Sequence, residues 1–263
     1  TTGAATLVGG IGFGIPVRSI AVVLDTPPPP STIFTAQLSG HQQAFPVATG
    51  GNGEITATLT GNELVVTGSY SGMTGLIDLN IAGGAHIHMG YAGQNGGIQL
   101  ELVPTPGTDL SGGMFLAALN TFTLTQAQID LLNNRQLYVN IHTTVFPAGE
   151  IRGQLLPEAD AYFSTNMFGS NEVPSIFSNS SGALALELHG DTIVVSGSFD
   201  NLDGKFNPNI AGGAHLHLGL AGQNGGIAIG LNTTVDNDLY GGFFAPAENT
   251  FVLTADQLAA LQA

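Results

Sequence analysis

The sequence contains one long segment twice, and this internal repeat limits the folds that the chain can adopt. Residues 81–97 read IAGGAHIHMGYAGQNGG, and residues 210–226 read IAGGAHLHLGLAGQNGG. The offset is 210 minus 81, or 129 residues, and the same offset relates Phe34 to Phe163. A unit of 129 residues is far longer than a solenoid repeat. The sequence therefore predicts two tandem copies of one domain.

Within each unit, apolar residues alternate with polar ones, as they do in half-buried β-strands. Ile55, Ala57 and Leu59 share one face of an expected strand, and threonines separate them. A turn at 61–62 then leads into a second expected strand over 64–70. Because such short strands recur between glycine-rich turns, we expect an all-β fold of two tandem antiparallel β-sandwiches.

Two short helices and a proline spacer complete the expected organisation. Capping boxes precede apolar residues at 125–128 and 254–257, which predicts one short helix in each domain. The prolines at 27–30 form a stiff, extended spacer, since each ring fixes φ and removes a donor. We therefore divide the chain into an N-terminal β arm with its spacer, a first domain and a second domain, at residues 1–30, 31–157 and 158–263.

The second unit ends before the counterpart of one β-hairpin of the first. Residues 137–156 are predicted to form two strands joined by a turn around Pro147. Ala263 corresponds to Asn134, because 263 minus 129 is 134, so this hairpin has no counterpart in the second unit. Removing two strands from a sandwich uncovers apolar core and an unpaired edge. We expect an incomplete second domain, with a truncated chain end as the alternative.

The N-terminal arm is the candidate for the missing strands. Val17-Arg18-Ser19-Ile20 is similar to Ile151-Arg152-Gly153-Gln154, and residues 5–24 match residues 137–156 in length. We expect the arm to complete the second domain of its own chain or of a neighbouring copy, and the stiff proline spacer favours the neighbour. A disordered leader is the alternative interpretation. The assembly residues of this hypothesis are Val17, Arg18, Ile20, Val22 and Leu24.

Five short motifs carry a family resemblance. They are Phe34-x-Ala36-x-Leu38-x-Gly40, Ala85-His-Ile-His88, Gly93-Gln-Asn-Gly96, Leu137-Tyr-Val-Asn-Ile-His142 and Pro147-x-Gly149-Glu-Ile-Arg-Gly-Gln154. The chain resembles the chordin-type domain, abbreviated CHRD, over 34–156 and again over 163–263. The resemblance implies a sandwich similar to Cu,Zn superoxide dismutase or immunoglobulin domains, and a secreted or cell-surface protein. Members of this family mostly lack an assigned activity, so the resemblance implies no reaction.

Histidines two residues apart on a strand leave the same face and can chelate one ion. His86 and His88 are placed in this way, as are His215 and His217 in the second unit. His142 lies on another expected strand, so the first unit gathers three histidines if the two strands are neighbours. Three imidazoles suit Zn²⁺ or Cu²⁺ and leave a position for water. The alternative is that these histidines only pack and hydrogen-bond under the glycine-rich loop.

Acidic residues suggest two further features. Glu150 and Arg152 lie on one face of an expected strand and are predicted to form a buried structural ion pair. Turns at 200–203 and 236–238 offer oxygen ligands for Ca²⁺, although neither has EF-hand spacing. The sequence has no cysteine, no Gly-x-Ser-x-Gly motif and no phosphate-binding loop, so we expect no enzyme. Only oxidation chemistry at a histidine-bound copper ion stays open.

The charge balance narrows the classes of partner. Lys and Arg total 4 against 19 Asp and Glu, and a net charge of −15 argues against binding nucleic acid or anionic lipid. No long apolar stretch predicts membrane insertion, and the first residue, Thr1, suggests a processed N-terminus. We expect a secreted structural protein that polymerises with copies of itself into an extracellular filament or surface assembly. The alternative is a secreted or periplasmic module that binds copper or zinc.

Overall fold

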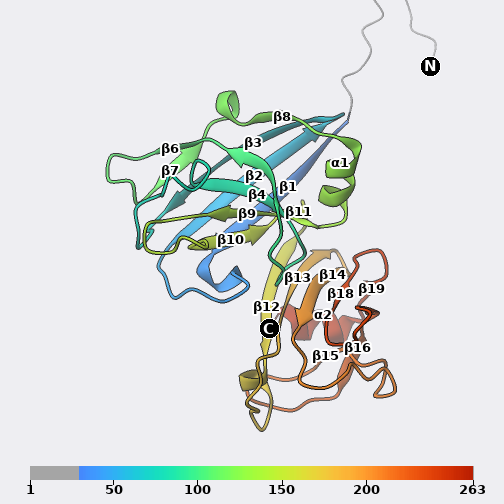
Figure 1. Ribbon diagram of the computed structural model, residues 1–263. Helices are drawn as coiled ribbons and strands as arrows, with labels where there is room; N and C mark the ends of the chain where they lie inside the picture. The colour runs from blue at the N-terminus through green and yellow to red at the C-terminus, as the bar shows by residue number, and fades with distance from the viewer. Residues whose placement is uncertain (1–29, 263) are drawn as a thin grey trace, which may run out of the picture.

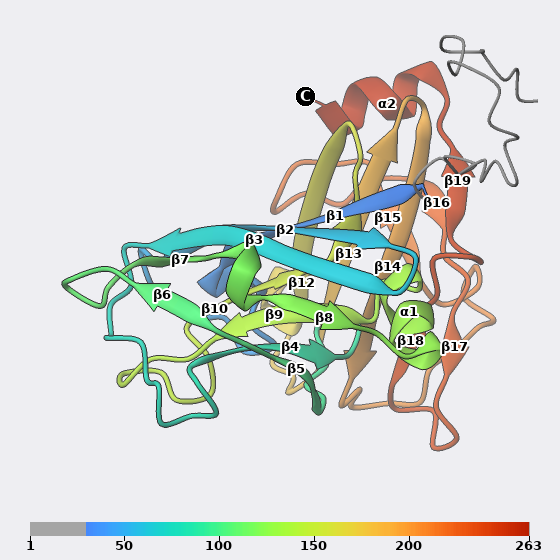
Figure 2. The ribbon, with the colours of Figure 1, turned by 90° about the horizontal axis from the view of Figure 1, so that it is seen from above.

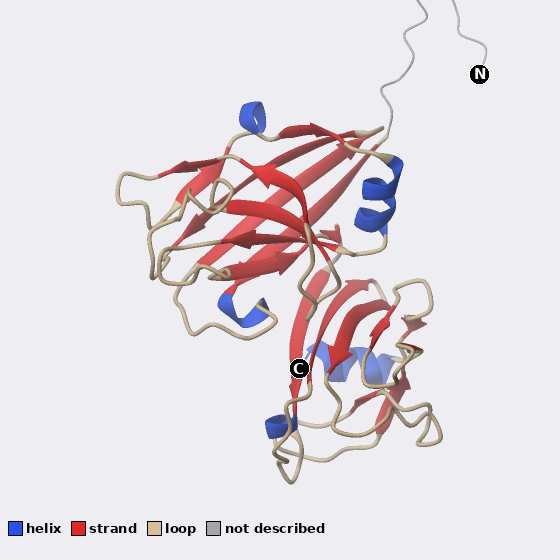
Figure 3. Cartoon of the chain, in the orientation of Figure 1, coloured by secondary structure: helices blue, strands red, loops and turns tan. Residues whose placement is uncertain are grey.

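The computed structural model describes residues 30–262, which are mostly β-strand and include two short α-helices (Figure 3). Antiparallel strands build two domains that follow one another along the chain. The expected all-β, sandwich-like class is confirmed, with one short α-helix in each domain. The N-terminal arm, with the predicted assembly residues at 17–24, lies outside the described residues, as does Ala263.

The first domain is one strongly curved antiparallel sheet around a single core. Its strands are β1 (Ser31–Ser39), β2 (Asn52–Thr60), β3 (Glu63–Ser71), β4 (Ala85–Met89), β5 (Ile98–Leu102), β6 (Pro104–Pro106), β7 (Gly113–Phe115), β8 (Thr121–Thr123), β9 (Leu137–Ile141), β10 (Ile151–Gln154) and β11 (Leu156–Pro157). The strand order is β5-β4-β9-β10-β1-β2-β3-β7-β6, with β8 on β3 and β11 on β1 (Figure 1). The hairpin β9–β10 therefore lies between β4 and β1, as the two views of Figures 1 and 2 also show.

The alternation read from the sequence decides which side chains enter this core. Ile55 and Ala57 are fully buried, whereas Thr56 between them is partly exposed. The β2–β3 hairpin turns at Gly61, whose φ of +63° a glycine adopts without strain. One apolar cluster extends through the domain, and its largest fully buried members are Phe34, Phe115, Ile55, Leu64, Ile87, Leu102, Leu132, Leu137 and Ile141. The predicted hairpin and its inward face are confirmed.

The second domain repeats part of this arrangement. Its strands are β12 (Ala161–Phe168), β13 (Ser181–His189), β14 (Thr192–Asp200), β15 (His215–His217), β16 (Ile227–Gly230), β17 (Thr234–Val235), β18 (Gly242–Phe244) and β19 (Thr250–Val252). One sheet has the order β12-β13-β14-β18-β17, with β19 on β14, while β15 and β16 pair only with each other. The eleven-stranded sheet of the first domain thus corresponds to two separate sheets in the second.

Both α-helices begin at the capping boxes that the sequence predicts. Helix α1 (Gln126–Asn133) has Thr125 as its N-cap, and the side chains of Thr125 and Gln128 each bond the other residue's backbone. Helix α2 (Ala255–Gln262) follows Thr254, which forms the same reciprocal bonds with Gln257. The remaining helical turns are the 3-10 segments η1 (Gly40–Gln42), η2 (Ala117–Leu119) and η3 (Gly169–Asn171).

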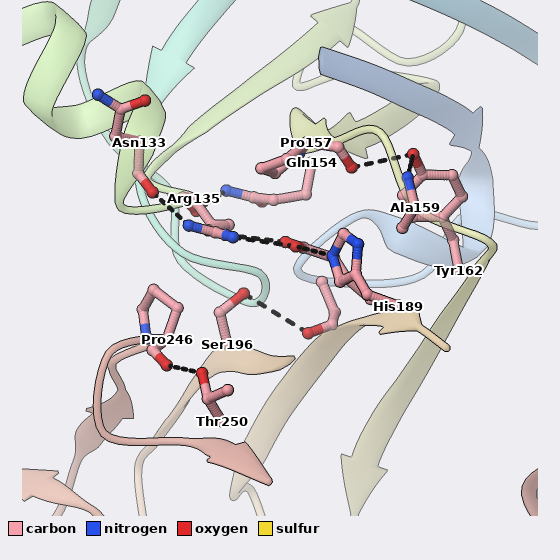
Figure 4. Close-up of polar contacts among 12 residues, drawn as sticks. Asn133, Arg135, Gln154, Pro157, Ala159, Tyr162, His189, Ser196, Pro246 and Thr250 are labelled. Atoms are coloured by element: carbon pink, nitrogen blue, oxygen red, sulfur yellow. Dashed lines mark hydrogen bonds and ion pairs between the residues drawn. The ribbon is translucent and has the colours of Figure 1, made fainter. Parts of the chain in front are cut away.

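The two domains contact each other through a small polar and aromatic junction. The long strands β12–β14 run across the direction of β1–β3 (Figure 2). Arg135, after helix α1, pairs with Glu187 of β13 at 2.9 Å between Nε and Oε1, and His189 contacts the same carboxylate (Figure 4). Tyr91 of the first domain stacks on Phe243 of the second, with ring centroids 5.3 Å apart. These specific contacts hold the two domains in position relative to each other.

One buried asparagine in each domain forms hydrogen bonds to the backbone of two other segments of that domain. The Asn120 side chain accepts from the Val103 N–H at 2.8 Å and donates to the Val103 and Leu116 carbonyls. Asn249, its counterpart, makes the same three bonds to Asn232 and Ala245. Neither asparagine has exposed surface. No local motif marks these asparagines, although both precede the Thr-Phe pair that the repeat preserves.

We predict that Asn120→Ala lowers the free energy of unfolding of the first domain by about 3 kcal/mol, because three buried backbone groups lose their partner. Denaturant unfolding followed separately for the two domains measures this change. Asn249→Ala should have the matching effect on the second domain, and Asn62→Ala, at an exposed turn, should have none. An unchanged first-domain transition in Asn120→Ala would show that these bonds do not stabilise the fold.

Candidate metal centre and open groove

Three histidines of the first domain meet on one face of the sheet. Strand β4 pairs with β9 so that His86 lies opposite Asn140 and His88 lies opposite Tyr138. His142 follows β9 two residues after Asn140 and therefore points to the same side. One nitrogen from each imidazole lies within 4.8 Å of the others. The structure thus brings together the three candidates that the sequence predicted for this domain.

Each of the three rings uses one nitrogen to bind a backbone carbonyl. His86 Nε2 lies 2.8 Å from the Ala82 oxygen, and His88 Nδ1 lies 2.9 Å from the Gly96 oxygen. His142 Nδ1 lies 2.9 Å from the Pro147 oxygen. Because a carbonyl only accepts, these contacts place the ring protons on those nitrogens. In this tautomer the other nitrogen of each ring carries a free lone pair. A histidine needs such a lone pair to bind a metal ion.

The free nitrogens have little else to bind. His86 Nδ1 and His88 Nε2 are buried and have no hydrogen-bond partner within the described part of the chain. His142 Nε2 has one long contact, 3.4 Å from Asn140 Nδ2. Buried polar atoms without partners are uncommon in native proteins, because losing water without a replacement costs free energy. The three nitrogens therefore form a donor set that fits a cation accepting nitrogen ligands.

The surroundings keep two of these imidazoles, those of His88 and His142, neutral. Burial is the largest influence on His142 and lowers its pKa to about 4, against a smaller opposing effect of the Pro147 carbonyl. Burial likewise lowers the pKa of His88, and His86 and Arg152 lower it further. Since only a neutral imidazole can ligate a metal ion, this electrostatic environment favours ligation near neutral pH.

The glycine-rich loop after β4 explains part of the arrangement. Gly96 supplies the carbonyl that His88 binds, and a side chain at this position would collide with the Met89 carbonyl. His88 also stacks on Tyr138, with ring centroids 5.2 Å apart and planes 9° apart. The lack of a side chain at Gly96 thus allows the loop to close over the histidine face.

The histidine pair of the second domain keeps the local bonds but lacks a third member. His215 Nε2 lies 2.7 Å from the Ala211 oxygen, and His217 Nδ1 lies 2.9 Å from the Gly225 oxygen. Both bonds are the counterparts of those in the first domain, yet this site is open to solvent. Among the residues that the structure describes, no third ligand joins this pair. In the first domain β9, which His142 follows directly, pairs with β4, whereas in the described part of the chain β15 pairs only with β16.

The predicted ion pair between Glu150 and Arg152 is wrong. Glu150 accepts four bonds, from the Thr49 and Thr143 hydroxyls and from the Thr74 and Gly75 backbone N–H groups. Burial raises its pKa, but these four donors together outweigh burial and lower it. The carboxylate therefore has enough neutral donors to stay charged without a cation.

The positive charge of Arg152 is stabilised by backbone carbonyls and an aromatic ring instead of a carboxylate. Its guanidinium donates to the Tyr91 carbonyl at 2.9 Å and to the Gln94 carbonyl at 2.7 Å. It also lies 3.4 Å from the centre of the Tyr138 ring, a cation–π contact. Burial lowers its pKa to about 10, which leaves it charged at neutral pH. Only the burial of Arg152 was predicted correctly; its partners are carbonyls of the glycine-rich loop.

The acidic turns proposed for Ca²⁺ and the remaining histidines form no second group of three ligands in the described residues. The acidic turns at 200–203 and 236–238 form no group of three carboxylates within the described residues. His41 contacts Asn166 across the domain junction, and His189 contacts Glu187. Within residues 30–262, the three histidines of the first domain are the only cluster of this kind.

The second domain contains a deep groove where the first domain holds its hairpin. In the described part of the chain, β12 pairs only with β13 and β15 pairs only with β16. Their counterparts β1 and β4 each have a second neighbour, which the hairpin β9–β10 supplies. A cavity of about 760 Å³ separates the two open edges. Its apolar lining includes Met167, Leu184, Phe199, Phe206, Leu231 and Phe244.

The first domain shows what normally fills this space. Ile55, Leu102 and Phe115, the counterparts of Leu184, Leu231 and Phe244, are almost completely buried, and the three groove residues themselves are at most 6% exposed. They belong to the same core cluster as the inward side chains of the hairpin, which are Leu137, Val139, Ile141 and Ile151. The groove of the second domain thus has the position and the apolar lining that belong, in the first domain, to the site of the hairpin β9–β10.

The fold and the site together define a tandem β-sandwich protein with a histidine cluster in one domain and an open strand groove in the other. Residues 34–155 and 163–263 both match the CHRD domain family. The chain therefore belongs to the CHRD domain family and contains two tandem copies of its domain. No curated protein and no solved structure shows significant similarity to the chain.

We predict that Glu150→Gln lowers the stability of the first domain by about 3 kcal/mol at pH 7, since a charged acceptor of four bonds is lost. The folded-state pKa of Glu150 is depressed, so its contribution is present above the unfolded pKa and is lost as pH falls through the folded pKa. Urea unfolding at pH 7 and pH 3 should therefore show less pH dependence in the variant. Equal pH dependence in both proteins would contradict this role.

Proposed function

We propose that the protein is the structural subunit of an extracellular filament or surface assembly. In this proposal the N-terminal arm of one copy enters the groove of the second domain of the next copy and completes its fold. The observation that supports it is the groove itself, with an apolar floor and two strand edges that have no partner among residues 30–262. Strand addition is a common mode of peptide recognition, because backbone bonds supply affinity and side-chain pockets supply specificity.

The physical reason is the cost of leaving such a groove in water. In the first domain the hairpin buries four apolar side chains completely. Burying each aliphatic side chain stabilises a fold by about 1.5–3 kcal/mol, so an empty groove forgoes roughly 6–12 kcal/mol before entropy is counted. Unpaired strand edges add a risk of disordered aggregation. A segment that fills the groove removes both costs.

The arm carries one residue that identifies how it would bind. Val17-Arg18 matches Ile151-Arg152, and the loop that receives Arg152 is repeated in the second domain as Ala221-Gly-Gln-Asn-Gly225. Arg152 binds the carbonyls of Tyr91 and Gln94, whose counterparts are Leu220 and Gln223. In our proposal Arg18 binds these two carbonyls, which fixes the register of the arm.

Head-to-tail addition of this kind gives a polymer. The arm and the groove are different surfaces, so each added copy leaves a free arm at one end and a free groove at the other. Copies of the chain itself are therefore the proposed partner, and the net charge of −15 disfavours nucleic acid. No helix of the described residues is long and apolar enough to cross a membrane. CHRD domains are typically extracellular, which supports secretion.

We predict that deleting residues 1–24 abolishes polymers and lowers the thermal stability of the second domain. Adding a peptide of residues 5–24 should restore that stability, with one peptide bound per chain and without restoring polymers. Negative-stain microscopy, light scattering and calorimetry measure these outcomes. Val22→Pro should act like the deletion because it removes a strand donor, and Thr2→Pro should not.

Two outcomes would contradict the polymer. One is a deleted protein with unchanged stability and no affinity for the peptide. The other is a full-length protein that stays monomeric at high concentration but loses second-domain stability on deletion, since the arm would then complete its own chain.

A second function, copper or zinc binding by the first domain, has its own supporting observation. The buried nitrogens of His86 and His88 have free lone pairs and no partner among the described residues, and His142 brings a third donor nearby. We propose that His86 Nδ1, His88 Nε2 and His142 Nε2 bind one Cu²⁺ or Zn²⁺ ion. Three protein ligands leave a coordination position for water. A structural subunit stabilised by such an ion needs no catalytic activity.

We predict that metal-free protein binds one Cu²⁺ or Zn²⁺ per chain and that the first domain melts at a higher temperature with metal than without it. His142→Ala should reduce the affinity by about 10- to 100-fold or more, because one of three ligands is lost. His215→Ala is the matched control and should bind as the unaltered protein does. Isothermal titration calorimetry measures both affinity and stoichiometry, and the absence of binding to the unaltered protein would exclude the site.

A further inference from the structure

The junction between the two domains buries a sheet face that would otherwise be exposed. Ala183, Ala185, Ser196 and Ser198 point out of the β13–β14 sheet, yet each is at most 6% exposed. The loop after β4 covers this face. The Ser198 hydroxyl donates to the Ala92 carbonyl at 2.7 Å, and Tyr91 stacks on Phe243 of β18. A loop of one CHRD domain thus docks on the outer face of the next.

Because the sequence is repeated, the chain contains a second loop of this kind and a second sheet face of this kind. In this structure neither the second loop nor the second face is covered. The counterpart of Tyr91 is Leu220, which is 75% exposed where Tyr91 is 4% exposed. The counterpart of Phe243 is Met114 of β7, which is 49% exposed. The counterpart of Ser198 is Ser69 of β3, which is also exposed. The loop lies on the second domain and the face on the first.

We infer that these two surfaces bind each other between copies, so that the loop Leu220–Gly222 of one copy docks on β3 and β7 of the next. The junction between copies would then repeat the junction within the chain. Leu220 would pack on Met114, and the Ser69 hydroxyl would donate to the Ala221 carbonyl. This inference rests on the proposed function and adds the surface that sets the geometry of the polymer.

The chain connectivity supports this pairing. Within the chain, the hairpin strand β10 completes the first domain and leads into β12, whose sheet receives the Tyr91 loop. In the polymer, the arm completes the second domain of the preceding copy and leads into β1, whose sheet would receive the Leu220 loop. Arg152 precedes Ala161 by 9 residues, and Arg18 precedes Thr32, the counterpart of Ala161, by 14. The arm has five residues more, so it can span the same distance.

Some contacts of the junction within the chain have no counterpart in the inferred junction between copies. Thr58 stands at the position of Glu187, so the ion pair with Arg135 has no counterpart. Glu54 stands at the position of Ala183, and its side chain is exposed. The junction between copies would therefore be less firmly held than the one within the chain and would depend more on the Leu220–Met114 contact.

Cysteine cross-linking tests this inference directly, because the chain contains no cysteine of its own. The double variant Leu220→Cys/Met114→Cys is assembled, checked for filaments by microscopy and treated with a short bis-maleimide reagent. We expect a ladder of covalent multimers on a denaturing gel. Tyr91→Cys/Phe243→Cys is the matched control and should cross-link within one chain without a ladder. The single variants should give no ladder.

The outcomes separate this inference from the proposed function. Filaments that give no ladder, while the control pair does cross-link, would overturn the docking surface and leave strand donation intact. A protein that forms no filaments would overturn both. As a second measurement, Leu220→Asp should raise the concentration needed for assembly by about tenfold or more, whereas Leu239→Asp, at a partly exposed site outside this surface, should not. Equal thresholds for both variants would also overturn the surface.

Discussion

The insertion of the hairpin β9–β10 between β4 and β1 is the interaction on which the first domain depends. It pairs with β4 over five residues and with β1 at Ser39, which joins both halves of the sheet around one core. The same hairpin brings His142 to the other two histidines and Arg152 to the glycine-rich loop. Closure of the sheet, burial of the core and the histidine cluster therefore all depend on the same hairpin.

The second domain shows the consequence of lacking this insertion in the described residues. Its β15–β16 pair forms a separate sheet, its histidine pair is partly exposed and its core faces a groove. The loop Leu220–Gly225 has the sequence to receive an arginine, as its counterpart in the first domain does. The lack of an inserted hairpin in the described residues thus explains three differences between two domains of similar sequence. Strand donation from a neighbouring copy would reverse all three, although residues 1–30 contain no histidine that could act as a third ligand.

Much of this architecture could be predicted from the sequence. The repeat of 129 residues predicted two similar domains, and the alternation at Ile55 and Ala57 predicted the inward face of β2. The spacing of His86 and His88 predicted a shared face, and the capping boxes marked the start of both helices. Apart from the repeat, these features are local, so a single strand or turn is enough to reveal them.

Long-range partners were harder to predict. The expected Glu150–Arg152 pair assumed that two opposite charges on one strand face must meet, but each binds polar groups from distant loops. The position of His142 next to β4 depended on strand order, which periodicity does not contain. The domain junction at Tyr91 and Phe243 had no sequence signal, because its residues are small, polar or singly aromatic. Such contacts depend on how separate elements pack.

The most direct measurement is a density map of the assembled full-length protein by electron cryo-microscopy. Strand donation predicts two additional strands between β12 and β15 of each second domain, continuous with β1 of a neighbouring copy through the proline spacer. It also predicts Arg18 of these strands beside the Leu220 and Gln223 carbonyls. An assembly in which the groove is empty, or is filled by the arm of the same chain, would contradict the account.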